Sequence, residues 1–167
     1  RTIFSCIRSQ VEMVEEGLID KETAVSRVPA NEFSKLFAPI LDNKIIRDLN
    51  ITPDTKGLNA SPGGACGQIY FNAKDAEKAA SEGKDVLLVR VETSPEDIGG
   101  MAVSRGIVTC RGGMTSHAAV VARGMGCPCV SGCGEITINE PKKTLVVNGK
   151  ELHEGDYMAI DGFTGNV

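Results

Sequence analysis

The sequence predicts an α/β domain that follows a helical segment, and three observations support this fold class. Between residues 68 and 122, short β-prone runs alternate with helix-like runs, an order that favours an α/β sandwich over an all-helical bundle. The amino-terminal part instead carries apolar residues at the three- and four-residue spacing of an amphipathic helix. After Gly126 the pattern becomes β-rich and includes Asn148-Gly149, a pair typical of a type I′ hairpin turn.

The amino-terminal residues are predicted to form short helices that act as connectors. The apolar stripe of the first helix consists of Ile3, Ile7, Val11, Val14 and Leu18. Gly17 is suited to end this helix, and Asp20 to cap a second one that stops before Pro29. Asn31 is a suitable cap for a third helix over residues 32–37. We expect these helices to pack on a neighbouring domain.

A change of composition marks the predicted boundary of the α/β domain. Proline and glycine interrupt residues 52–67, which predicts an irregular, turn-rich segment. We therefore expect a helical connector over residues 1–55 and the α/β domain over residues 56–167. The chain starts with Arg1 rather than methionine, so we expect a segment of a longer polypeptide.

Each element of the α/β part has its own sequence signal. Strands are expected at residues 68–71, 86–91, 107–110, 129–131, 135–139, 144–147, 150–153 and 157–161. The run at 86–91 is apolar without alternation, which predicts a strand buried on both faces. Helices are expected after the caps Asn72 and Ser94, and a third is expected to start near His117 and to end at Gly124.

Composition disfavours several classes of partner. The 18 basic and 22 acidic residues are interspersed and give a net charge of -4, which argues against nucleic acid. No basic amphipathic stretch indicates a membrane surface, the apolar runs are too short to span a bilayer, and no signal peptide is evident. The 6 cysteines are scattered along a chain that can build a core, so we expect reduced thiols in a cytoplasmic protein.

The stretch from Arg111 to Cys133 is the strongest candidate for a functional site. Gly112 and Gly113 allow the backbone to approach a ligand closely, and Thr115 or Ser116 can cap the helix that follows. The free N–H groups and the positive dipole end of such a helix favour an anion. The composition of this stretch therefore suits a phosphate site.

His117 lies in the first turn of this predicted helix. A neutral imidazole can attack phosphorus without a separate base, so His117 is a candidate nucleophile. Arg111 offers the guanidinium donors that clamp phosphate oxygens, and Gly112, Gly113 and Ser116 are further phosphate-contacting candidates. On these grounds alone, a histidine after a Gly-Gly turn is more often a capping or surface residue than a nucleophile, and His117 is only a candidate. Arg123 is interpreted as a solvated charge or a partner of the helix dipole, and His153 as a strand residue without chemistry.

A long motif favours the functional interpretation of His117. The run from Thr109 to Cys133, with Arg-Gly-Gly-Met-Thr-Ser-His-Ala-Ala-Val-Val-Ala-Arg-Gly-Met-Gly at its centre, resembles the phosphohistidine signature of the pyruvate phosphate dikinases. Further matching runs are Met13 to Ile19, Ala60 to Gly63, Val89-Arg90, Thr93 to Ile98, Glu154 to Tyr157 and Ile160 to Gly162. The departures, at Gly99-Gly100 and at Cys127-Pro128-Cys129, leave the histidine untouched.

The resemblance implies a swivelling β/β/α phosphohistidine domain. His117 would accept a phosphoryl group derived from the β-phosphate of ATP and pass it to pyruvate, within a reaction that converts ATP, phosphate and pyruvate to AMP, pyrophosphate and phosphoenolpyruvate. An ATP-grasp domain would precede this segment and a TIM barrel would follow it, in a homodimeric enzyme that binds Mg²⁺ through those other domains. The isolated chain is thus expected to be a phosphotransferase fragment without cofactor of its own.

Three alternatives remain open, together with one hypothesis about regulation. Phosphoenolpyruvate synthase and enzyme I of the phosphotransferase system carry related histidine domains, although Met114 and Val-Ser-Gly-Cys favour a dikinase. A non-enzymatic interaction module would leave His117 inert. A zinc site could use Cys127, Cys129 and Cys133 with that histidine, but the spacing lacks paired Cys-x-x-Cys knuckles. In some dikinases a threonine at the position of Thr115 is phosphorylated, and such a charge would repel an incoming phosphoryl group.

Overall fold

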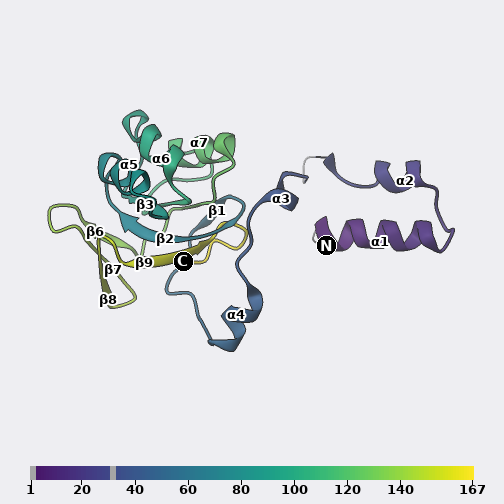
Figure 1. The fold of residues 1–167 in the computed structure, drawn as a ribbon, viewed down its shortest axis with the longest axis horizontal. Helices are drawn as coiled ribbons and strands as arrows, with labels where there is room; N and C mark the ends of the chain where they lie inside the picture. The colour runs from purple at the N-terminus through teal and green to yellow at the C-terminus, as the bar shows by residue number, and fades with distance from the viewer. Residues whose placement is uncertain (1–2, 31–32) are drawn as a thin grey trace. The chain divides into compact units, whose positions relative to one another are not determined.

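The computed structural model describes residues 3–30 and 33–167, which form two compact units, Arg1–Ala38 and Pro39–Val167 (Figure 1). The functional boundary predicted between residues 55 and 56 stays a prediction. Within the described ranges, no helix is both long enough and apolar enough to cross a membrane.

The first unit contains three short helices, α1 (Ile3–Glu15), α2 (Lys21–Ser26) and α3 (Ser34–Phe37). The first two confirm the sequence signals: Gly17 has a left-handed φ of 73° just after α1, and Asp20 caps α2 by accepting a hydrogen bond of 2.6 Å from the Thr23 backbone N–H. For the third helix, the predicted cap Asn31 and the predicted start at Glu32 lie outside the described residues.

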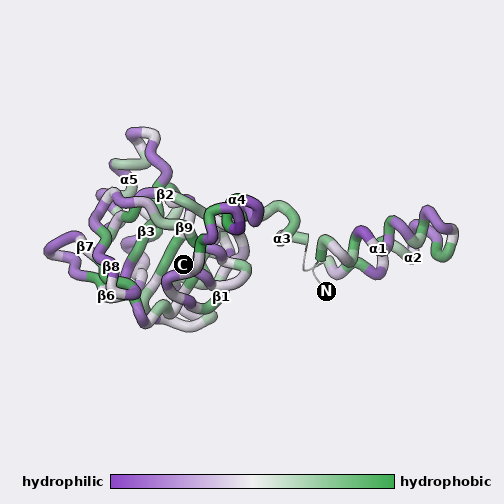
Figure 2. Tube along the Cα trace, turned by 90° about the horizontal axis from the view of Figure 1, so that it is seen from below, coloured by the Kyte–Doolittle hydropathy of each residue, from purple (hydrophilic) through white to green (hydrophobic). Residues whose placement is uncertain are grey.

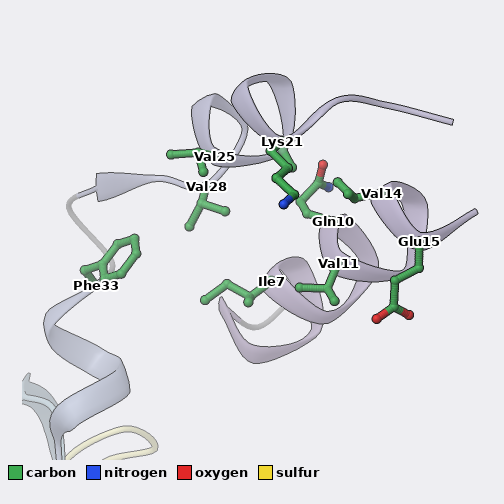
Figure 3. Close-up of a pocket in the computed structure, with 10 residues that line it drawn as sticks. Ile7, Gln10, Val11, Val14, Glu15, Lys21, Val25, Val28 and Phe33 are labelled. Atoms are coloured by element: carbon green, nitrogen blue, oxygen red, sulfur yellow. The ribbon is translucent and has the colours of Figure 1, made fainter. Parts of the chain in front are cut away.

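Helices α1 and α2 leave an open apolar groove of about 610 Å³ between them (Figure 3). The residues that line it are Ile7, Gln10, Val11, Val14, Glu15, Lys21, Ala24, Val25, Val28 and Phe33. Among the described residues of this unit, only Ile3 and Ala24 are buried. The apolar stripe that predicted α1 therefore faces this groove rather than a closed core.

A six-stranded sheet forms the centre of the second unit, in the order β1-β5-β4-β3-β2-β9. Strands β2 to β5 run parallel to one another, whereas the edge strands β1 and β9 are antiparallel to their neighbours. The strands are β1 (Leu58–Ser61), β2 (Gly64–Tyr70), β3 (Val86–Arg90), β4 (Gly106–Thr109), β5 (Cys129–Ser131) and β9 (Tyr157–Asp161). As predicted, β3 is buried on both faces, with its residues 86–89 fully inaccessible.

The prediction of an irregular segment at residues 52–67 is confirmed for residues 52–57, which form no helix or strand apart from an isolated bridge at Lys56, and wrong for most of residues 58–67. This region contributes β1 and the first half of β2, and it is preceded by a helix that the sequence did not predict, α4 (Asn43–Asp48). Gly63 has a positive φ of 132° between the two strands, whereas Gly64 and Gly67 serve close packing. A Cβ on Gly64 would lie 2.7 Å from the Leu41 backbone nitrogen, and one on Gly67 would lie 2.8 Å from the Asp85 carbonyl oxygen.

Different layers cover the two faces of this sheet, which confirms the β/β/α architecture (Figure 1). Helices α5 (Ala73–Ser81), α6 (Ile98–Val103) and α7 (His117–Met125), with the 3₁₀ helix η2 (Pro95–Asp97), cover one face. A three-stranded sheet of β6 (Thr137–Asn139), β7 (Thr144–Val147) and β8 (Lys150–His153) covers the other. Alternate residues of β3 enter the two cores, with Val86 and Leu88 toward the helices and Leu87 and Val89 toward the small sheet.

The carboxyl-terminal strands divide between the two sheets. Asn148 and Gly149 have φ angles of 47° and 74°, so the predicted type I′ turn between β7 and β8 is confirmed. The last strand, β9, does not join this β-rich layer but pairs with β2 of the central sheet. Seen from below, the tube in Figure 2 shows apolar residues along β3 and β9 inside this unit.

Candidate functional site

His117 is the first residue of α7, and α7 follows the carboxyl end of the parallel strand β4. In parallel sheets this edge is where ligands usually bind. Ser116 caps the helix by accepting a hydrogen bond of 3.3 Å from the Ala119 backbone N–H. The buried residues Ala118, Ala119 and Ala122 hold α7 against the sheet. The predicted helix start is thus confirmed, while its end is not Gly124 but Met125, followed by Gly126 at a left-handed φ of 67°.

Two glycines shape the loop that leads into α7. Gly112 has a φ of 104°, and a Cβ there would lie 2.9 Å from the Ser116 Cβ. Gly132, with a φ of 69°, brings its Cα close to this loop, because a Cβ on it would lie 2.9 Å from the Gly112 carbonyl oxygen. A Cβ on Gly113 would meet nothing within 4 Å. Gly112 is therefore needed for the backbone conformation, whereas Gly113 borders open space that a ligand can use.

Arg123 braces the same loop. Its Nε donates to the Ala119 carbonyl at 3.0 Å, and its Nη2 donates to the carbonyl of Met114, which lies in the loop before the helix. The Ser116 backbone N–H also donates to the Gly113 carbonyl at 3.0 Å. Of the two interpretations of Arg123, a cation in the last turn of α7 agrees with its position, and the residue is exposed, but its guanidinium is not a free charge, because it reaches back across the helix to the loop that carries His117.

The structure adds a residue that the site prediction did not include, Thr93. Its Oγ1 lies 3.0 Å from Nδ1 of the half-buried His117. Among the described residues, no side chain or backbone group bonds the other ring nitrogen, Nε2. Thr93 lies in the loop after β3, within the Thr93 to Ile98 run that carried part of the resemblance. That run was the one signal that could have pointed to it.

The structure brings most of the predicted site residues together at one junction of loop and helix. Ser116 caps α7 directly before His117, and Gly112 and Gly113 lie in the loop before that cap. The Arg111 side chain is exposed, and its backbone N–H donates to the Val91 carbonyl at 2.9 Å, which ties the loop to the end of β3. Thr115 is also exposed. The phosphate-contacting and regulatory roles assigned to these residues stay predictions.

The model of the family described as "PEP-utilising enzyme, mobile domain" matches residues 82–165, a stretch that contains both Thr93 and His117. The chain belongs to this family. The matched stretch begins just after α5 and ends just after β9, so it covers η2, α6, α7, the small sheet and the histidine loop.

Relatives of this mobile domain are named as pyruvate, phosphate dikinases. The chain is 48% identical to the chloroplastic protein of Flaveria pringlei, 50% to the protein of Rhizobium meliloti and 48% to that of Clostridium symbiosum, each over the whole chain. It covers 17%, 18% and 19% of the three proteins, respectively. The resemblance inferred from the motif is confirmed, and the chain spans less than a fifth of the length of these relatives.

The cysteines of the mobile domain do not converge as zinc ligands. Cys127 and Cys129 belong to the core under the helices, whereas Cys133 belongs to the core under the small sheet. Across residues 3–30 and 33–167, no group of three or more His, Cys, Asp or Glu side chains is placed to hold a metal ion. Burial raises the pKa of the Cys133 thiol to about 12 and that of Cys129 to about 11, so both stay protonated near neutral pH.

Proposed function

We propose that this mobile domain is the phosphoryl carrier of a pyruvate, phosphate dikinase, with His117 as the residue that is phosphorylated. The observation that carries the proposal is the contact of 3.0 Å between Thr93 Oγ1 and His117 Nδ1 at the start of α7. When Nδ1–H donates to the threonine oxygen, the lone pair of the ring lies on Nε2. Nε2 is then the nitrogen that attacks phosphorus.

The chemistry requires a nucleophile and a seat for the transferred group. In the first half-reaction, a P–N bond forms between Nε2 and the β-phosphorus of ATP while the bond from that phosphorus to the bridging oxygen of AMP breaks, and the electron pair leaves with AMP. Inorganic phosphate then takes the γ-phosphoryl group: a new P–O bond forms in pyrophosphate, the β–γ bridge breaks, and the β-phosphoryl group stays on Nε2. In the second, the P–N bond breaks and the enolate oxygen of pyruvate takes the phosphoryl group. The proton on Nδ1 stays with the ring throughout, held by Thr93.

Several groups are suited to hold the phosphoryl oxygens. The free backbone N–H groups of the first turn of α7 and the helix dipole favour the anion by about 0.3–1 kcal/mol. Gly113 borders open space beside them, and the exposed Arg111 side chain can swing toward the oxygens as a guanidinium clamp. Ser116 adds a hydroxyl that already caps the helix. Together these residues form the proposed phosphate seat.

The remaining parts of the reaction would come from the same polypeptide. Because the relatives are more than five times longer than this chain, we place an ATP-grasp domain before residues 1–55 and a TIM barrel after residue 167. Mg²⁺ would be held in those domains, and the parent enzyme would be a homodimer. The swivel would then carry residues 56–167 between the two distant sites.

Regulation and compartment follow from the same assignment. Phosphorylation of the exposed Thr115 would add about -1.5 to -2 charges two residues before His117 and repel the incoming group. The free cysteines of the chain suit a reducing compartment, and we propose the cytoplasm. The relative from Flaveria pringlei is named as chloroplastic, so the stroma is the other compartment to test.

The decisive experiment labels the full-length polypeptide with phosphoenolpyruvate that carries ³²P. Acid-labile, alkali-stable label is expected in the wild type and in His153→Ala, and it should vanish in His117→Ala. His153 is the matched control, because it is the other histidine of the chain and lies exposed in the small sheet. Label that survives in His117→Ala, or its absence from the wild type, would reject the proposal.

A further inference from the structure

A chain of polar contacts leads away from the histidine toward the end of β3. Thr93 touches His117, and its neighbour Ser94 donates two hydrogen bonds to Oδ2 of Asp97, one from the backbone N–H at 2.9 Å and one from the hydroxyl at 3.3 Å. The other carboxylate oxygen, Oδ1, lies 3.6 Å from Nε of Arg90. The contacts thus connect the imidazole to a buried ion pair.

Arg90 holds three structural elements at this point. Its Nη1 donates at 2.8 Å to the Phe71 carbonyl, just after β2, and at 3.0 Å to Oε1 of Glu140, in the turn between β6 and β7. The Arg90 side chain is 22% exposed and that of Asp97 8%, whereas Glu140 is 51% exposed. The pair with Asp97 is therefore on the protein side of the guanidinium and the contact with Glu140 on the solvent side.

Because Asp97 is buried, the geometry of the segment from Thr93 to Asp97 depends on the groups that contact the Asp97 carboxylate. A carboxylate removed from water needs charged or N–H partners, and losing one of them leaves the others strained or unpaired. Thr93 itself lies outside any helix or strand, so its position follows from the Ser94–Asp97 contacts and from the end of β3. A change at Arg90 or Asp97 should therefore displace the Thr93 hydroxyl from the ring.

We infer that Arg90 and Asp97 are positioning residues: they hold Thr93 against Nδ1 of His117 and so keep the lone pair of the imidazole on Nε2. This inference rests on the proposed function, in which Nε2 is the attacking nitrogen. Neither residue touches the phosphoryl group in this scheme. They select the tautomer through Thr93.

The tautomer can be read without any phosphoryl transfer. In the ¹⁵N-histidine-labelled 167-residue chain, long-range ¹H–¹⁵N spectra report which ring nitrogen carries the proton, and the exposed His153 serves as an internal reference. We expect His117 to be mainly Nδ1–H in the wild type. Thr93→Val, Asp97→Asn and Arg90→Lys should each shift the ratio of the two tautomers at least threefold toward Nε2–H.

Glu140→Gln is the matched control, because it removes a contact of the same guanidinium on its solvent side. It should leave the tautomer ratio of His117 as in the wild type. Folded Asp97→Asn and Arg90→Lys variants with an unchanged ratio would overturn the inference. If Asp97→Asn fails to fold by circular dichroism, Arg90→Lys decides, because it keeps the charge beside Asp97 and removes only the geometry of the guanidinium.

Labelling of the full-length polypeptide separates this inference from the proposed function. A tautomer that depends on Arg90 and Asp97, in a protein that never labels at His117, would leave the positioning network standing and remove the carrier role. Wild-type labelling rates in Asp97→Asn and Arg90→Lys, together with an unchanged tautomer ratio, would remove the positioning network and leave the carrier role standing. If both proposals hold, the labelling rate of these variants falls about in proportion to the remaining Nδ1–H form.

Discussion

The two adjacent glycines of the histidine loop should respond in opposite ways to the same substitution. In Gly112→Ala, the new side chain must adopt a φ of 104°, which costs about 1–3 kcal/mol, and its Cβ would lie 2.9 Å from the Ser116 Cβ. Relief of this overlap adds about 1 kcal/mol. We therefore expect Gly112→Ala to lower the free energy of unfolding by about 2–4 kcal/mol.

Gly113→Ala is the matched control, because its Cβ would enter open space and its φ is not in the left-handed region. Its free energy of unfolding should stay within about 0.5 kcal/mol of the wild type or rise by up to about 1 kcal/mol, since alanine restricts the unfolded chain. Urea unfolding followed by far-ultraviolet circular dichroism measures both values. A loss below about 1 kcal/mol in Gly112→Ala, or an equal loss in both variants, would refute this reasoning.

Two further predictions concern packing and the buried thiols. Gly100→Ala should cost about 1–3 kcal/mol of unfolding free energy, because its Cβ would lie 2.7 Å from the Ala73 Cβ across the contact between α5 and α6. In Gly99→Ala, the new Cβ would meet only the flexible Glu77 carboxylate, so the free energy of unfolding should rise by up to about 1 kcal/mol. Equal effects of Gly100→Ala and Gly99→Ala in urea unfolding would contradict this prediction. Burial raises the pKa of Cys133 from 9.0 to about 12, so the folded chain retains this proton where the unfolded chain loses it, and the free energy of unfolding should fall as the pH rises between those values. Cys133→Ala should reduce that slope in urea titrations at successive pH values, and an unchanged slope would show that other groups cause it.

Local sequence signals were sufficient to predict an element wherever it depends on residues within a turn or two of one another. Asn72 caps α5 as predicted, by accepting a hydrogen bond of 2.8 Å from the Asp75 backbone N–H. The type I′ turn at Asn148-Gly149 and the buried strand β3 were predicted on the same basis. In each case the decisive chemistry is a cap, a left-handed φ or a continuous apolar run, and all three are visible in a short stretch of sequence.

Gly64 and Gly67 were predicted to interrupt regular structure but lie in β2, because glycine has two structural uses. Glycine permits a left-handed turn, but it also permits two backbones to approach closely. Gly64 packs against the Leu41 backbone, and Gly67 against that of Asp85, which lies just before the neighbouring strand. Which purpose applies depends on what lies across the sheet, and no local pattern contains that information.

The candidate site also combines residues that the local sequence predicted with one that only the tertiary structure places there. The sequence alone placed His117, Gly112, Gly113 and Ser116 at the start of one helix, because these residues are nearly contiguous and their capping and turn chemistry is local. Thr93 is 24 residues away in the chain and reaches the imidazole because β3 and β4 are parallel neighbours whose carboxyl ends meet at one edge of the sheet. The partner of Nδ1 is therefore a property of the folded sheet, since only strand pairing brings the two loops within hydrogen-bonding distance.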